Sequence, residues 1–292
     1  MGNVLIKGDL FDPKLVKDLF NQVKGKSAVA ALCGQTPVEF NGNKYFVFSM
    51  DNEVDLLAEN QKRSHGGITV DPVKVIPHEI EYGARVSEDF MNASEEEQLD
   101  ILQAFLEGFS RKAAKGLDIM AFHGKNPRSG EASNLITSHF DLVNQTVVWD
   151  GGDKPDEAVD DAIALIDDWD ITGLAMSRQF ASAIGKMRTS SGEKMYPGLS
   201  WGGDPGQVNG VKSSVNSTVS DATSKDCAIV GDFANCFKWG YSKQVKLEII
   251  PYGDPDNTGV DLKGSGQIYL RATAAIGFGI LVQDAFSRVV EG

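Results

Sequence analysis

The chain has 292 residues, of which 41% are hydrophobic, and a formal net charge of -13 at pH 7. This length and apolar fraction suit one large or two ordinary globular domains, and no run approaches the roughly 20 uninterrupted apolar residues of a membrane span. The acidic balance and the lack of a basic tract argue against a protein that grips nucleic acid, because affinity for phosphate comes from clustered Lys and Arg.

Residues 1–34 read as a short amphipathic segment followed by small residues, which is typical of an arm rather than a domain. The apolar side of this segment includes Leu15, Leu19 and Phe20. Charged residues scattered through residues 1–20 exclude a secretory signal. Three cysteines lack the spacing of a disulfide framework, so we expect reduced thiols made in a cytoplasm. They are Cys33, Cys227 and Cys236.

Residues 35–86 predict a long two-stranded projection with a polar tip at residues 60–67. Strand-like runs within residues 38–48 lead outward, and alternating apolar residues from 68 to 86 lead back. The runs on either side of Ile76 are out of phase, so one sheet accepts both only with a bulge or bend near Ile76 and Pro77. A lone hairpin is marginal in water, so its apolar side chains need a further surface, such as another subunit.

Charged residues stand at the tip of this projection, namely Glu59, Lys62 and Arg63. We expect them to meet opposite charges on a neighbouring subunit, because charges at the rim of an interface set register and association rate. Together with the apolar arm residues, they are the candidate subunit-interface residues of the sequence.

One long helix follows the projection. Ser94-x-x-Glu97 is a capping-box signature, and apolar residues recur at helical spacing from Leu99 to Met120. A basic second half complements the helix dipole. The helix is predicted to end near Gly124.

The remaining elements mix helices and strands in segregated groups, which favours an α+β class. A helix is predicted from Pro155, with an apolar face that extends to Trp169, and a second from residue 179 to 187. A short strand at residues 174–176 separates them. Residues 190–224 read as turns and loops, and alternating strands return at residues 245–249 and 268–274.

No catalytic, cofactor or metal constellation stands out. None of the four histidines has zinc-ligand spacing, and no nucleophile elbow or phosphate loop is present. Residues 254–259 resemble half of a calcium loop, but Ser265 replaces the bidentate Glu, which favours a plain turn. The acidic residues between Asp160 and Asp170 are spaced as a solvated helix face. The survey favours a structural protein over an enzyme.

Several stretches, taken in order, resemble the tailed-bacteriophage major capsid proteins, which share the Hong Kong 97-type shell fold with encapsulins. The segment 58–62 resembles the family's extended loop, and 73–90 the strand that feeds its spine helix. Residues 176–197 resemble the axial-domain run of strand, helix, turn and aromatic-Pro pair. The closing region is similar at residues 231–250 and 271–286.

The resemblance implies an α+β Hong Kong 97-type capsid fold with four parts. They are an N-terminal arm (1–34), an extended β-hairpin loop (35–83), a spine-helix peripheral domain (84–144 and 245–292) and an axial domain (145–244). The loops of the axial domain would meet around hexamer and pentamer axes.

The implied function is a major capsid protein that self-assembles into the icosahedral or prolate shell around the dsDNA genome of a tailed phage. The DNA would be enclosed without sequence-specific binding, in a virion assembled in the host bacterial cytoplasm, with no membrane and no cofactor. A portal is expected. Many relatives begin with a scaffolding region that is later removed. Since none precedes the arm here, either a separate scaffold protein is used or that region has already been cut off, and Met1 favours the separate scaffold. An encapsulin-type nanocompartment and an unrecognised hydrolytic enzyme remain the alternatives.

Some relatives weld their subunits by an isopeptide bond between a Lys of the extended loop and an Asn of a neighbouring peripheral domain. Here Lys62 is suitably placed, but no Asn follows Asn257 in the closing strands. We therefore expect a shell held by noncovalent contacts alone.

Overall fold

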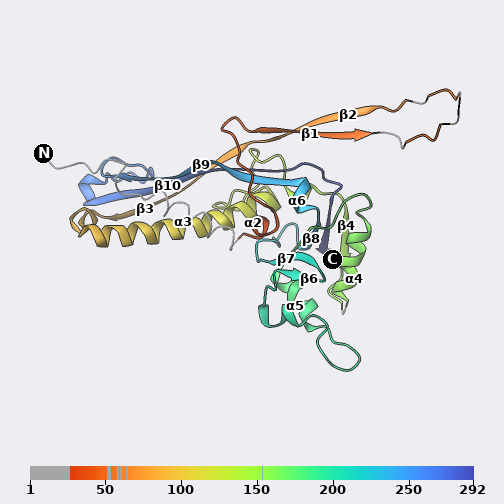
Figure 1. Ribbon diagram of the computed structural model, residues 1–292. Helices are drawn as coiled ribbons and strands as arrows, with labels where there is room; N and C mark the ends of the chain where they lie inside the picture. The colour runs from red at the N-terminus through yellow and green to blue at the C-terminus, as the bar shows by residue number, and fades with distance from the viewer. Residues whose placement is uncertain (1–26, 51–53, 58, 60, 64, 153) are drawn as a thin grey trace.

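The computed structural model describes residues 27–50, 54–57, 59, 61–63, 65–152 and 154–292. Three regions are apparent in Figure 1: a two-stranded projection at the upper right, a three-stranded sheet with a long helix on the left, and a six-stranded sheet at the lower right. The arm residues Leu15, Leu19 and Phe20 lie outside the described part. No helix among the described residues is long and apolar enough to cross a membrane.

The projection is an antiparallel pair of strands, β1 (Asn43–Met50) and β2 (Ile68–Val75). The predicted irregularity near Ile76 is a change of sheet rather than a bulge within one sheet. The strand β2 pairs with β1, whereas β3 (Pro77–Ser87) pairs with β10 (Gln267–Ile280). Because β2 and β3 belong to different sheets, the alternation of apolar side chains can change phase between them without a bulge.

The three-stranded sheet has the order β3-β10-β9, with β10 antiparallel to both β3 and β9 (Phe237–Ile250). The predicted final long strand is therefore confirmed as β10. A 3-10 turn, η1 (Glu88–Asn92), leads from β3 to the long helix, and η4 (Lys263–Ser265) precedes β10.

The long helix, α3 (Glu95–His123), begins with the predicted capping box. The Ser94 hydroxyl accepts from the Glu97 N–H and the Glu97 carboxylate from the Ser94 N–H, both at 3.3 Å. It ends at Gly124, whose φ of 61° is the left-handed cap that favours glycine. The predicted apolar face is buried from Leu102 to Met120, whereas Leu99 near the helix start is 44% exposed.

The α3 helix packs on the three-stranded sheet through small residues of β10. Leu106, Phe109 and Ala113 form one cluster with Ala272 and Ala274 of β10. The two alanines let the helix approach the strand closely, so α3 is held along the sheet over much of its length (Figure 1).

The six-stranded sheet has the order β4-β11-β8-β5-β7-β6. Its strands are β4 (Thr146–Trp149), β5 (Gly173–Met176), β6 (Gln207–Val208), β7 (Val211–Val215), β8 (Asp226–Gly231) and β11 (Phe286–Glu291). The helices α4 (Pro155–Ala164) and α5 (Arg178–Lys186) share a core with it. Residues 190–224, expected as loops, also contain η3 (Pro197–Gly202), β6 and β7.

Two boundaries differ from the expected division of the chain. The last strand, β11, was expected with the long helix, but it pairs with β4 and β8 in the six-stranded sheet. Conversely, the first half of β9 lies in the three-stranded sheet. Strand partners are chosen by long-range pairing, which local periodicity does not report. Trp169 also lies beyond the end of α4 and is 38% exposed.

A single aromatic core joins the two sheets. Phe140, in η2 (Phe140–Leu142), lies 5.6 Å from Phe122 and 5.0 Å from Phe286 between ring centroids. It also lies 5.3 Å from both Phe233 of α6 (Phe233–Cys236) and Phe237 of β9. All five rings are fully buried, so this core fixes the end of α3 against both sheets.

The start of the described chain is anchored to α3 by one buried carboxylate. Asp118 accepts hydrogen bonds from the backbone N–H groups of Ala28 and Val29, at 2.9 and 3.2 Å, at the start of α2 (Ala28–Leu32). It also accepts from the side chains of Ser27 at 2.5 Å and Thr218 at 2.7 Å. Burial raises the pKa of Asp118, and these donors oppose that rise.

Candidate functional site

One face of the β1–β2 projection is apolar and open to solvent. Phe46 stands opposite Pro72 and Phe48 opposite Val70, so their side chains share a face. Phe46, Phe48 and Ile68 are 60%, 68% and 66% exposed. A hairpin with so much exposed apolar surface is marginal in water, so this face is a candidate contact surface.

The predicted tip residues Glu59, Lys62 and Arg63 are all exposed. They belong to the segment that joins β1 to β2 at the far end of the projection (Figure 1). Val54 and Leu56 beside them are 98% and 94% exposed. The structure thus brings the tip charges and the apolar ribbon into one projection, whereas the arm residues of the same prediction lie outside the described part.

The loop that resembles half of a calcium site is closed around an arginine. Nη2 of Arg85, from β3, lies 2.5 Å from Asp256 Oδ1, 2.8 Å from Asp254 Oδ1 and 2.5 Å from Thr258 Oγ1, and donates to the Val260 carbonyl oxygen at 3.0 Å. Hydrogen bonding to Arg85 lowers the pKa of Asp256 to about 2. The guanidinium supplies the positive charge that the carboxylates need.

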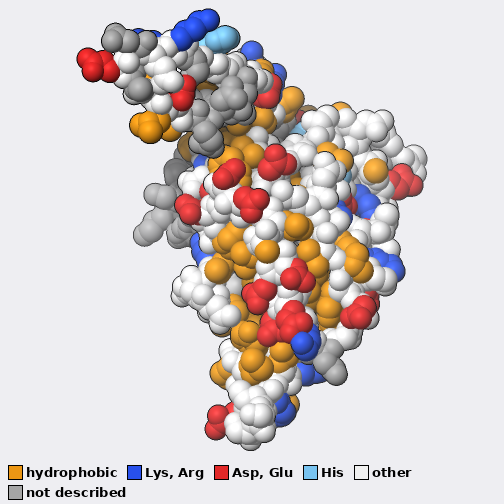
Figure 2. Space-filling model, turned by 90° about the vertical axis from the view of Figure 1, so that its right-hand side faces the viewer, with side chains coloured by type: hydrophobic (Ala, Val, Ile, Leu, Met, Phe, Trp, Pro, Cys, Tyr) orange, Lys and Arg blue, Asp and Glu red, His pale blue; other side chains and the backbone are white. Residues whose placement is uncertain are grey.

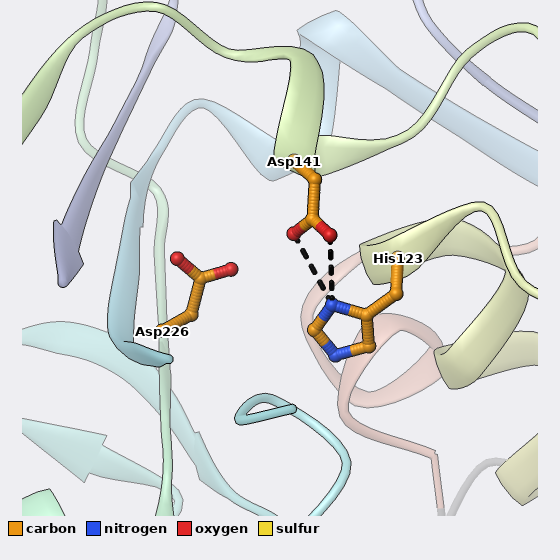
Figure 3. Close-up of side chains that lie close together, drawn as sticks. All are labelled: His123, Asp141 and Asp226. Carbon is orange, nitrogen blue, oxygen red and sulfur yellow. Dashed lines mark hydrogen bonds and ion pairs between the residues drawn. The ribbon is translucent and has the colours of Figure 1, made fainter. Parts of the chain in front are cut away.

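A second cluster of charges is buried where α3 ends (Figure 3). The ring nitrogen Nδ1 of His123 lies 3.1 and 3.2 Å from the two carboxylate oxygens of Asp141 in η2. Asp226, the first residue of β8, has no exposed surface and lies beside them. Arg288 of β11 places Nε 3.4 Å from Asp226 Oδ1 and Nη1 3.6 Å from Asp141 Oδ1.

The contacts of His123 indicate an imidazolium ion. Its Nε2 lies 2.9 Å from the Thr218 carbonyl oxygen, which only accepts, and its Nδ1 faces a carboxylate, so both nitrogens donate. Burial alone lowers the pKa of His123, but the hydrogen bond and charge of Asp141 outweigh it and the pKa is raised. Burial raises the pKa of Asp226 to about 7, although Arg288 opposes this.

His123, Asp141 and Asp226 also have the side-chain types of a metal site. Ligand atoms of His123, Asp141 and Asp226 lie within 4.8 Å of one another, which is compatible with a divalent cation. Such a cation would have to displace the Nδ1 proton of His123 beside the guanidinium of Arg288. Two cationic side chains already face the two carboxylates, so we interpret the group as an ion cluster that ties α3, η2, β8 and β11 together.

Sequence reasoning missed this cluster because its members come from four segments far apart in the chain. Metal-ligand motifs are recognised in a sequence by short spacings, and none of these residues has another within a helical turn. By contrast, the predicted exposure of the acidic residues from Asp160 to Asp170 is confirmed, although only Asp160 and Asp161 lie on α4, which ends at Ala164. These residues are all exposed: Asp160, Asp161, Asp167, Asp168 and Asp170.

Comparison with known proteins gives one family and many structural relatives. The model of the phage capsid family matches residues 7–290. A solved chain of Mycobacterium phage Ogopogo is 28% identical with a TM-score of 0.80, covering 91% of this chain and 92% of that one. A chain of Gordonia phage Cozz is 20% identical with a TM-score of 0.74, covering 90% and 86%.

A further relative comes from the capsid of an empty GTA particle computed with C5 symmetry. It is 12% identical with a TM-score of 0.62, and the match covers 100% of this chain and 94% of that one. No curated protein matches the sequence. The architecture described above is therefore shared by solved structures over nearly its full length.

Proposed function

This chain belongs to the phage capsid family and has the role of a major capsid protein, and we propose that its projection and arm carry the subunit contacts of a closed shell. It is a structural protein of the virion capsid that self-assembles into capsomers. The family resemblance and the Hong Kong 97-type fold predicted from the sequence are thus confirmed. The encapsulin-type compartment and the hydrolytic enzyme are not favoured.

The observation that carries the proposal is the exposed apolar face of the projection. Phe46 and Phe48 are more than half exposed on a two-stranded ribbon that no third strand extends within the described residues. A neighbouring copy of the chain is the natural cover for this face, because permanent interfaces between identical subunits are large and apolar. The charges of Glu59, Lys62 and Arg63 would then set the register of the contact.

We further propose four functional units. The arm spans residues 1–34, the extended loop 35–83 and the axial domain 145–244, and the peripheral domain combines 84–144 with 245–292. The sheets depart from these bounds at two strands, since β11 pairs within the six-stranded sheet and the first half of β9 within the three-stranded sheet.

We also propose what the shell encloses and how it assembles. The formal net charge of -13 suits a wall that encloses dsDNA without binding its sequence, since an acidic surface repels phosphate. We propose hexamers and pentamers, a separate scaffold protein, a portal and assembly in the host cytoplasm. Noncovalent contacts would hold the shell, and denaturing gels of mature particles would then give a single monomer band.

Electron microscopy and sedimentation of the expressed chain, with its scaffold partner where assembly needs one, test the proposal. Wild-type protein should form shells or capsomers, and a double change of Phe46 and Phe48 to Ser should prevent them. Leu135→Ser is the matched control, since Leu135 is 77% exposed but lies outside the projection. A wild-type chain that remains monomeric at high concentration would contradict self-assembly, and unaffected shells of the double variant would contradict the role of the projection.

A further inference from the structure

Trp201 differs from every other tryptophan of the chain. Trp239 and Trp149 are 1% and 7% exposed and Trp169 is 38% exposed, whereas Trp201 is 99% exposed. Its φ of 62° and ψ of 27° lie in the left-handed region, which is unfavourable for a bulky side chain. A large apolar ring is thus held out in solvent at a conformational cost, and strain of this kind concentrates at functional positions.

The segment that carries Trp201 has a firm base. Leu199, two residues earlier in η3, is 2% exposed and belongs to the core of the six-stranded sheet. A Cβ on Gly185 of α5 would lie 2.6 Å from the Leu199 carbonyl oxygen, so helix and loop are in close contact. The exposed ring is therefore presented by a packed element rather than by a loose loop, which lowers the entropy lost on binding.

Three basic side chains lie in the segment 186–194, whose Lys194 contacts Trp201. The Lys194 ammonium lies 5.7 Å from the centroid of the Trp201 ring, which is a cation-π arrangement. Lys194 forms a β-bridge with Arg188, and Lys186 is the last residue of α5. Lys186 and Arg188 are exposed, residues 186–194 contain one acidic residue, Glu193, and Asp204 after Trp201 is exposed as well. The result is an apolar anchor with a positive rim.

An acidic surface with an apolar centre lies on the flank that carries α4. Figure 2 looks onto this flank, where hydrophobic side chains gather among acidic ones. Leu165 and Trp169, after α4, are 42% and 38% exposed, and Asp167 and Asp168 beside them are also exposed. The α4 helix packs on β4, β11 and β8, whereas η3 packs on α5 and leads to β6 at the far edge of the sheet. The Tyr196 hydroxyl, just before η3, lies 3.4 Å from a carboxylate oxygen of Asp156 in α4.

We propose that Trp201 of one subunit docks on the Leu165–Trp169 surface of the next subunit in a capsomer, with Lys186 and Arg188 facing Asp167 and Asp168. The proposal rests on self-assembly as described above and names a second pair of contact surfaces. Rings of identical subunits require two different, complementary surfaces on each copy, and these two are complementary in charge and belong to different elements of one domain. An aromatic anchor within a charged rim is the usual form of an energetic hot spot.

The substitution Trp201→Gly removes the proposed contact without destabilising the subunit. Glycine adopts a φ of 62° without strain, so the melting temperature of the unassembled subunit should stay unchanged or rise. The protein concentration needed for assembly should nevertheless increase by about tenfold or more, as for the loss of a hot-spot residue. Trp201→Phe, which keeps an aromatic ring, should assemble closer to wild type.

Charge reversal tests the partner surface. Changing Lys186 and Arg188 to Glu, or Asp167 and Asp168 to Lys, should each weaken assembly. The variant that carries all four changes should recover most of it, because every copy then presents both reversed surfaces. If the fourfold variant is as weak as the sum of its parts predicts, these residues do not face one another and the proposed pairing is wrong.

Fluorescence distinguishes this inference from the proposed function. The emission attributable to Trp201, obtained as wild type minus Trp201→Phe, should shift to shorter wavelength on assembly as the ring leaves water. Wild-type shells with no shift, together with Trp201→Gly shells at the wild-type concentration, would overturn this inference and leave the capsid role intact. A wild-type chain that never assembles would instead count against the proposed function itself.

Discussion

The projection and the junction around Phe140 use aromatic residues in opposite ways. In the projection Phe46 and Phe48 face solvent, whereas at the junction the rings around Phe140 are fully buried. The junction also neutralises its own charges, with His123 and Arg288 against Asp141 and Asp226. The junction therefore stabilises the subunit, and the projection has apolar surface left for contacts with other subunits.

The largest effect is expected at the junction. Phe140→Ala should lower the free energy of unfolding of the isolated subunit by about 3–5 kcal/mol, because it empties the centre of a ring cluster. Chemical denaturation of unassembled protein measures this. A loss of unfolding free energy below about 1 kcal/mol would show that the junction contributes little to the stability of the subunit.

The buried ion cluster should give a pH-dependent stability. The folded-state pKa of Asp226 is raised to about 7 and that of His123 is raised above its usual value, so both contribute stability that is lost as pH rises through these values. Between pH 5.5 and 8.5 the free energy of unfolding should fall by on the order of 2 kcal/mol. The pKa of Asp141 is lowered, so its contribution to stability is lost only as the pH falls into the acid range, outside this window.

Asp226→Asn removes one titrating group and should flatten this pH profile. Asp161→Asn is the control, because Asp161 is an exposed carboxylate on α4. An unchanged slope in Asp226→Asn, matching that of the control, would assign the pH dependence to groups outside the cluster.

A Phe-to-Ala change in the projection should affect assembly rather than the stability of the subunit. Phe48→Ala should change the unfolding free energy of the unassembled subunit by no more than about 0.5 kcal/mol, as is usual for exposed positions. Assembly, followed by light scattering, should be weakened clearly. Equal losses for Phe48→Ala and Phe140→Ala would abolish the distinction between the two regions.

The smallest effect on the subunit is expected at the tip. Reversing Lys62 and Arg63 to Glu should leave unfolding unchanged, because both side chains are exposed. The rate of assembly and its dependence on salt should change, since rim charges act mainly on association. Identical kinetics at low and high salt in wild type and variant would remove the tip from the contact.

The sequence by itself determined the local elements and, through its resemblance, the family. The capping box at Ser94, the helix that ends at Gly124 and the long strand β10 all follow from short-range patterns that a few neighbouring residues decide. The exposed ribbon was likewise evident from its alternation, and the order of the elements indicated the capsid family.

Only the tertiary structure decided which distant segments meet. The change of sheet at Ile76, the place of β11, the arginine within the loop after β9 and the cluster around His123 all depend on partners far away in the chain. The exposure of Trp201 belongs to the same class, since burial is a property of the packed whole. Periodicity reports which face of an element is apolar, whereas the identity of the surface that covers it is fixed by long-range packing.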